Sequence, residues 1–338
     1  MGVPIVSVVM PVWRAEGTLA EALADVRAQT LGAWECVVVL DGEADRSGDV
    51  AREYMHEDAR FRVVARPHAG IVAALNAGLE AARAPLVARF DADDRMAPTR
   101  LARQVELLDR RPEVTLVSCG VALEVGGDHR HEGMLRHAAW LDTLDTPEKM
   151  RAARFVDAPV AHPAVTFRKA DVLAAGGYRD GPFAEDHDLW LRLFGAGAVF
   201  DRVPEALVTW RDHAARLTRT DRRYADAERR ALVHHHLLAP GGPLDGRAAR
   251  IWGAGEYGKR HARELAARGA RLSDLLDIDP RKIGQTIAGL PVTDAATLGP
   301  PDGRVVLACV ASPGARALIA ARLAARGWSE DHDWWARQ

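Results

Sequence analysis

Residues 86–94 read Leu-Val-Ala-Arg-Phe-Asp-Ala-Asp-Asp, a mostly apolar run that ends in three carboxylates within four positions. The apolar part predicts a buried strand, and open α/β sheets bind ligands at the carboxyl ends of their strands. Asp91 and Asp93 offer the oxygen ligands that Mg²⁺ or Mn²⁺ prefers beside a diphosphate. The same residues also fit an acidic turn that caps the next helix, because Asp93 and Asp94 precede Pro98-Thr99.

Strands of the same kind occur on both sides of this one. Val6–Met10 is apolar after Ser7, which is typical of a strand buried on both faces. Thr18 and Glu21 form a capping-box pattern that predicts the start of a helix. This alternation predicts an α/β fold, a mostly parallel sheet with helices on both faces. Further strands are expected at Cys36–Leu40, Arg62–Ala65, Leu86–Phe90, Leu116–Gly120 and Ala164–Phe167, with helices at 18–29, 71–82, 99–108, 170–175 and 183–194.

The composition excludes several classes of protein. The chain has 338 residues, of which 48% are hydrophobic and 27% charged, enough to bury a sizeable core. Its net charge of −2 provides no overall basic field for nucleic acid. Cys36, Cys119 and Cys309 lie far apart without a CxxC pair, and we expect buried thiols. No apolar run reaches the ~18 residues of a membrane-spanning helix, and no basic leader is visible, so we expect a cytoplasmic protein.

A second domain is expected near the carboxyl end of the chain. Residues 239–246 read Ala-Pro-Gly-Gly-Pro-Leu-Asp-Gly, a turn-rich stretch with little to bury. We therefore expect one domain over residues 1–238, a linker over 239–249 and a small Rossmann-like domain over 250–338. Residues 126–159 have a weaker pattern and are expected to form a variable surface segment. In the last domain we expect strands at 249–252, 275–278 and 305–310 and helices at 255–267 and 315–325. We expect Trp328, Trp334 and Trp335 to pack on this domain, with contact to a partner or an acceptor lipid as the alternative.

Gly253, Gly255 and Gly258 follow a predicted strand and open a predicted helix, the context of a dinucleotide-binding turn. Asp277 and Asp279 lie 19 and 21 residues after Gly258, where an acid would contact a ribose. The glycines equally suit tight packing of a helix on a strand without any ligand. Residues 250–338 are few for a full cofactor domain, so we do not expect bound NAD(P), while recognition of an acceptor or a nucleotide-sugar stays open.

Several short motifs lie along residues 4–220 in the order of a known family. They are Ser7–Trp13, Ala28–Thr30, Val37–Gly42, Gly70–Gly78 and Ala88–Asp94, followed by Glu185–Leu193 and Trp210–His213. Together these segments resemble the family-2 glycosyltransferases, which have the GT-A fold. The C-terminal stretch is similar to small Rossmann-like modules attached to sugar-modifying enzymes.

The resemblance implies a binding site for a nucleotide-sugar. Asp41 would accept the N–H of uracil, although Leu40 and Glu43 depart from the family's Asp-Asp-Gly-Ser and leave the nucleobase open. Asp91 would lie at the ribose and the metal, and Asp93 would coordinate the metal. The remaining donor-side residues implied are Pro11, Val12, Trp13, Glu16 and Asn76.

The resemblance also implies the groups on the acceptor side. Asp186 would be the general base, because a sugar hydroxyl must lose its proton as its oxygen attacks the anomeric carbon. Glu185 would flank it, although acidic residues at a helix start also suit the positive end of the helix dipole. Arg211 would neutralise the leaving diphosphate, and His213 would contact metal or diphosphate unless it is only a solvated surface residue.

The function implied is metal-dependent, inverting transfer of a sugar from a UDP-sugar to a hydroxyl group, with Mg²⁺ or Mn²⁺. The acceptor would be a glycan, a lipid-linked glycan or a small molecule in cell-surface polysaccharide or glycoconjugate synthesis. Contact with the inner face of the membrane stays open. Two alternatives are an NAD(P)-linked oxidoreductase acting through the C-terminal domain and a non-catalytic sensor of sugar nucleotides.

Overall fold

The computed structural model describes residues 2–125, 132–213, 216–312 and 314–337. The chain forms two compact units. The first contains Met1–Arg151 and Ala158–Glu228, and the second contains Ala152–Asp157 and Arg229–Gln338. This division lies ten residues before the boundary at Leu238 that the sequence suggests, and a short piece of the earlier chain joins the second unit. The domain boundaries stay a prediction.

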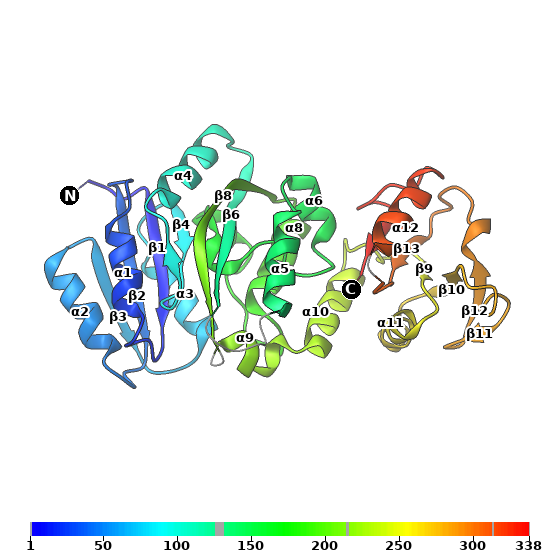
Figure 1. Ribbon diagram of the computed structural model, residues 1–338, viewed down its shortest axis with the longest axis horizontal. Helices are drawn as coiled ribbons and strands as arrows, with labels where there is room; N and C mark the ends of the chain where they lie inside the picture. The colour runs from blue at the N-terminus through cyan, green and yellow to red at the C-terminus, as the bar shows by residue number, and fades with distance from the viewer. Residues whose placement is uncertain (1, 126–131, 214–215, 313, 338) are drawn as a thin grey trace. The chain divides into compact units, whose positions relative to one another are not determined.

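Eight strands form the sheet of the first unit within the described ranges, in the order β3-β2-β1-β4-β7-β6-β8-β5. Figure 1 labels six of them, β1, β2, β3, β4, β6 and β8. Strands β3, β2, β1 and β4 run parallel, and so do β6 and β8. Strand β7 is antiparallel to both of its neighbours, and β5 is antiparallel to β8. The predicted α/β fold is confirmed, with a more mixed sheet than expected. The strands are β1 Val6–Val12, β2 Trp34–Asp41, β3 Phe61–Arg66, β4 Leu86–Arg89, β5 Arg95–Met96, β6 Val114–Val125, β7 Thr166–Arg168 and β8 Val199–Asp212.

The middle of this sheet is fully buried, as the apolar runs predict. Every residue of β1 and β2 is buried. In the parallel register, Val12 of β1 pairs with Leu40 of β2, and Val9 pairs with Arg89 of β4. The carboxyl ends of these three strands therefore meet at one edge of the sheet, where ligands bind in such folds.

The five helices that the sequence predicts in the first unit are confirmed, and α2, α5 and α9 lie outside the predicted places. Helix α3 packs against β1 and β2, and α4 packs against β6 and β8. In the part of the chain that the structure describes, no helix is both long enough and apolar enough to cross a membrane. The helices of this unit are α1 Leu19–Arg27, α2 Ser47–Glu57, α3 Ile71–Ala81, α4 Arg100–Arg110, α5 Glu132–Asp142, α7 Lys169–Ala174, α8 Glu185–Gly195 and α9 Leu217–Thr220, with 3-10 turns at His162–Ala164 and Arg222–Tyr224.

Further local features of the first unit differ from the sequence predictions. Thr18 precedes α1 without a side-chain capping bond, and its hydroxyl donates instead to Ala15 O at 3.5 Å. The stretch expected to be a variable surface segment contains α5 and α6 (Pro147–Ala153) in its described part. Strand β8 was not predicted, because buried and more exposed positions follow one another in it without an apolar run.

The second unit has a smaller sheet with the order β11-β12-β10-β9-β13-β14. Neighbouring strands from β12 to β14 are parallel, and β11 is antiparallel to β12. The predicted strands and helices are confirmed, while α10, β11, β12 and β14 were not predicted. The elements are α10 Asp226–Leu238, β9 Ala249–Trp252, α11 Glu256–Ala267, β10 Leu272–Asp277, β11 Thr286–Ile287, β12 Leu290–Asp294, a 3-10 turn at Ala295–Thr297, β13 Val305–Ala308, α12 Ala315–Ala324 and β14 Trp334–Ala336.

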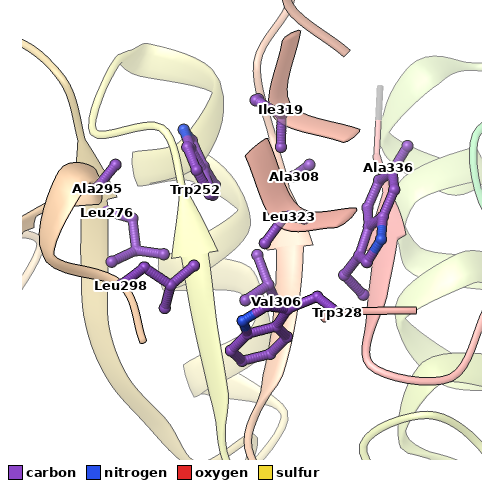
Figure 2. Packing of buried hydrophobic residues seen from close by; sticks show 11 residues of the cluster. Trp252, Leu276, Ala295, Leu298, Val306, Ala308, Ile319, Leu323, Trp328 and Ala336 are labelled. Carbon is purple, nitrogen blue, oxygen red and sulfur yellow. The ribbon is translucent and has the colours of Figure 1, made fainter. Parts of the chain in front are cut away.

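A tryptophan-rich core holds the second unit together. Trp252, Val306, Leu323 and Trp328 belong to one cluster of buried side chains around β9, β13 and α12 (Figure 2). The predicted packing of Trp328, Trp334 and Trp335 is confirmed, since all three are buried. The three cysteines of the chain are also buried thiols, as expected.

The glycine-rich turn between β9 and α11 is closely packed at two of its three glycines. Gly253 has φ of +119°, and a Cβ there would lie 2.7 Å from Cys309 O. A Cβ on Gly258 would lie only 1.7 Å from Gly253 O. Gly255 has extended backbone and no atom within 4 Å of its Cβ position. Packing therefore explains the first and third glycines but not the second.

We predict that Gly258→Ala destabilises the second unit by about 1–3 kcal/mol or more, because the new methyl group must displace backbone. Gly255→Ala is the control and should cost about 1 kcal/mol at most, because a Cβ there meets no atom within 4 Å and only the preference for Gly at the N-cap of α11 is lost. Scanning calorimetry with limited proteolysis of both variants measures the effect. Equal unfolding of the two variants would contradict the packing explanation.

Candidate active site

Three carboxylates meet directly after β4. Asp91, Asp93 and Asp94 each offer one oxygen, and these oxygens all lie within 4.8 Å of one another. Asp91 and Asp93 are half-buried, and Asp94 is buried. Such a concentration of negative charge at a strand end is unfavourable unless cations or hydrogen-bond donors offset it.

Donors from β8 and from β4 itself surround this acidic cluster. The short antiparallel pairing of β5 with β8 brings residues near 211–213 beside residues 91–94. His213 Nε2 lies 2.9 Å from Asp93 Oδ2, and the backbone N–H of Arg211 donates to Asp94 Oδ1 at 3.0 Å. Arg89 forms an ion pair with Asp91. The sequence-predicted residues Asp91, Asp93 and His213 are thus brought together.

The chemistry of the acidic cluster fits a divalent cation. Asp94 Oδ2 is buried and has no hydrogen-bond partner within the described residues. Burial raises the pKa of Asp94 well above its usual range, and the charges of Asp91 and Asp93 raise it further. Carboxylate oxygens with a nearby imidazole are ligands that Mg²⁺ or Mn²⁺ accepts. A cation here would offset the repulsion that the carboxylates otherwise impose on one another.

Arg211 does not direct its guanidinium toward the acidic cluster. Its Nη2 lies 2.5 Å from Glu21 Oε2, and its Nε donates to Glu124 Oε2 at 3.1 Å, because Glu124 is its partner across β6 and β8. Arg216 is the nearer side chain, with Nη1 at 3.9 Å from Asp94 Oδ1. The sequence analysis missed Arg216, since it stands in an arginine-rich stretch where no pattern separates one arginine from the next.

The predicted nucleoside end lies where β1 and β2 finish. Pro11 and Val12 are buried in β1, and the next residue, Trp13, is 40% exposed. The ring of Trp13 stacks on His68 with centroids 3.8 Å apart and planes inclined by 19°. Glu16 Oε2 accepts a hydrogen bond from the backbone N–H of Arg46 at 3.1 Å, so it supports the start of α2.

Asp41 and Asn76 are both occupied by contacts within the protein. Asp41 is buried and accepts hydrogen bonds from the backbone N–H groups of Ala69 and Gly70. The amide of Asn76 donates to Tyr178 O at 2.8 Å and accepts from Tyr178 N at 3.0 Å. Asn76 thus fixes the loop after α7, and its nucleotide role stays a prediction.

The predicted acceptor side lies at the start of α8. Glu185 is buried, and its Oε2 accepts a hydrogen bond from the Tyr224 hydroxyl at 2.8 Å. Asp186 is half-buried, and its Oδ1 accepts from the backbone N–H of His187 at 2.7 Å. Burial raises the pKa of both Glu185 and Asp91, and the positive charge of Arg89 opposes that rise in each. Arg89 therefore acts electrostatically on both ends of the predicted site.

A buried histidine and tyrosine support this region and were missed by the sequence analysis. His162 Nε2 and the Tyr178 hydroxyl lie 2.8 Å apart, and both side chains are buried. Burial lowers the pKa of His162 well below its usual range, so the ring stays neutral. No sequence pattern around His162-Pro163 or around Gly-Gly-Tyr178 predicts that these two side chains meet.

In the second unit, one predicted acid does lie beside the glycine-rich turn. Asp277 Oδ2 accepts a hydrogen bond from Ala254 N at 2.7 Å and lies 3.2 Å from Lys282 Nζ. Asp279 instead accepts from Arg281, with Oδ2 at 3.0 Å from Nη2. Asp277 therefore ties the turn to β10, and the role of this region as a ligand pocket stays a prediction.

Comparison with known proteins identifies the family of the chain. The model of glycosyl transferase family 2 matches residues 7–173. Amylovoran biosynthesis glycosyltransferase AmsE of Erwinia amylovora is 33% identical over 191 residues, which cover 56% of this chain and 69% of that protein. The chain belongs to glycosyltransferase family 2. The predicted family and enzyme class are thereby confirmed.

Two further proteins place this glycosyltransferase among its relatives. The UDP-Gal:alpha-D-GlcNAc-diphosphoundecaprenol beta-1,3-galactosyltransferase of Escherichia coli is 27% identical over 241 residues, covering 69% of this chain and 84% of that one. The structure of S. aureus TarS 1-349 in complex with UDP-GlcNAc is 16% identical, with a TM-score of 0.53, and the match covers 78% of this chain and 70% of that one. The predicted GT-A fold is confirmed by this likeness.

We predict that Tyr224→Phe destabilises the transferase by about 1–3 kcal/mol at pH 7.5, because buried Glu185 loses its donor. The Tyr224 hydroxyl lowers the pKa of Glu185, which burial has raised. In the folded variant the Glu185 carboxyl takes up its proton at a higher pH than in the folded wild type. The difference in free energy of unfolding between variant and wild type therefore shrinks as the pH falls. Urea unfolding at pH 7.5 and pH 5 measures both effects.

Tyr54→Phe is the control for this substitution, because the Tyr54 hydroxyl bonds Ala20 O at an exposed position. Its effect should be small and the same at both pH values. If Tyr224→Phe lowered the free energy of unfolding by the same amount at pH 5 and pH 7.5, the assigned role of the hydroxyl would be wrong.

Proposed function

We propose that this family 2 glycosyltransferase transfers a sugar from a UDP-sugar to a hydroxyl group, with inversion at the anomeric carbon. The observation that carries the proposal is the cluster of Asp91, Asp93 and Asp94 at the end of β4, with His213 at 2.9 Å from Asp93. A compact set of oxygen and imidazole ligands at the ligand-binding edge of an α/β sheet suits a nucleoside diphosphate.

Asp93 and His213 are the residues that we propose to hold Mg²⁺ or Mn²⁺, with Asp91 beside them. Asp93 is 33% exposed at its side chain and so is open to a ligand, whereas Asp91 is already paired with Arg89. When bound, the cation would offset negative charge on the departing diphosphate. Arg216, close to Asp94, would contribute a fixed positive charge to the same region.

Asp186 is the proposed general base. It would accept the proton of the acceptor hydroxyl as that oxygen attacks the anomeric carbon and the bond to the diphosphate breaks. Buried Glu185 and Tyr224 would hold the start of α8 in place behind it. A direct displacement that uses one base inverts the configuration of the sugar carbon.

The names of the relatives support an acceptor in cell-surface polysaccharide synthesis. One relative is named for amylovoran biosynthesis, and another is named for transfer to GlcNAc-diphosphoundecaprenol. We propose a glycan or lipid-linked glycan as the acceptor. The first unit would carry the transfer, and the second would be a Rossmann-like accessory domain.

The donor site is tested by calorimetric titration of UDP with and without Mn²⁺. We expect Mn²⁺ to tighten UDP binding to the wild type and Asp93→Ala to abolish this gain, because the variant lacks the most accessible carboxylate. Asp109→Ala removes an exposed carboxylate of α4 and is the control. Equal manganese dependence in Asp93→Ala and wild type would remove Asp93 from the metal site.

The role of Asp186 is tested separately by Asp186→Asn, which keeps the size of the side chain and removes its basicity. We expect kcat to fall by about 10²- to 10⁴-fold with unchanged UDP binding. Hydrolysis or transfer of a UDP-sugar, followed by release of UDP, gives the readout. Turnover near the wild-type value, with Asp109→Asn as the control, would exclude Asp186 as the base.

A further inference from the structure

The carboxylate of Asp41 has little capacity left for a ligand. Its Oδ1 accepts from Arg66 Nη1 at 2.8 Å and from Ala69 N at 3.0 Å. Its Oδ2 accepts from Gly70 N at 2.8 Å and lies 2.8 Å from His68 Nδ1. A carboxylate has about four lone-pair sites, so these contacts saturate it. A nucleobase N–H could reach this group only by displacing one of them.

The contacts of His68 fix which of its nitrogens carries the proton. Nδ1 lies 2.9 Å from the backbone carbonyl of Asp41 and 2.8 Å from its carboxylate, and both partners are acceptors. Nδ1 must therefore be the N–H donor. In the neutral ring, Nε2 then has a lone pair that can accept a hydrogen bond.

Trp13 and Gly42 hold the imidazole in this position. The ring of Trp13 stacks on the imidazole at 3.8 Å, and the side chain of His68 is half exposed. A Cβ on Gly42, which has φ of +93°, would lie 2.8 Å from the Trp13 ring and 3.1 Å from His68 Cβ. The absence of a side chain at residue 42 is what lets the two rings stack over the end of β2.

We propose that His68 Nε2, and not the Asp41 carboxylate, recognises the nucleobase of the donor. This inference rests on the proposed function and adds which residue contacts the nucleobase of the UDP-sugar. A lone pair at Nε2 accepts the N3–H of uracil, whereas N3 of cytosine carries no proton. Asp41 and Arg66 are positioning residues that hold the imidazole in the required tautomer.

The direct test is NMR of the protein labelled with ¹⁵N at histidine, titrated with UDP and with N3-methyl-UDP. The His68 signals are assigned by their loss in His68→Phe. We expect the Nε2 resonance to move on addition of UDP and to stay in place with N3-methyl-UDP. Movement with both ligands would reflect stacking alone and would overturn the inference.

His68→Phe gives a second, independent readout. The phenyl ring can still stack on Trp13 and cover Asp41, but it offers no nitrogen. In calorimetry we expect wild type to bind UDP about 3- to 10-fold more tightly than N3-methyl-UDP, and the variant to bind both equally.

The outcomes separate this inference from the proposed function. UDP binding to wild type without any change at His68, or an unchanged preference in His68→Phe, overturns the role of His68 and leaves the donor site standing. Failure of wild type to bind UDP in the presence of Mn²⁺ overturns both.

Discussion

The mutual repulsion of Asp91, Asp93 and Asp94 is the constraint on which the architecture of the first unit depends. Each carboxylate is offset by a different partner: Arg89 for Asp91, His213 for Asp93, and the backbone of Arg211 for Asp94. Two of these partners lie about 120 residues further along the chain, and the pairing of β5 with β8 brings them close. A long strand with polar positions is thus required to complete a site that begins at β4.

The partial neutralisation of this cluster leaves negative charge that a bound cation would offset. Arg89 and Arg216 supply two positive charges against three carboxylates. Fully paired carboxylates would leave no ligand for a metal, and unpaired ones would be costly to bury. Asp94 bears most of that cost, since burial and its two neighbours all raise its pKa.

Patterns over a few neighbouring residues predicted the βαβ units and the acidic run at 91–94, because buried strands and helix periodicity depend on residues close in sequence. The partners of Asp41, Asn76 and Arg211 could not be read in this way. Asn76 meets Tyr178 and Arg211 meets Glu124 only after distant strands pair. A family motif located Asp41 correctly at the end of β2, while its saturation by Ala69, Gly70, Arg66 and His68 is a property of the folded loop.

The glycine-rich turn of the second unit also has a function that the sequence pattern alone does not decide. Its sequence fits dinucleotide recognition and close packing equally well, and only contacts separate the two. Gly253 and Gly258 have backbone within 3 Å of where a Cβ would stand, and Asp277 already accepts from Ala254 N inside the turn. Asp277 stabilises the turn in this way and its contact with a ribose stays a prediction, so the motif alone is no argument for redox chemistry. Transfer chemistry is therefore better sought at the carboxylates of the first unit.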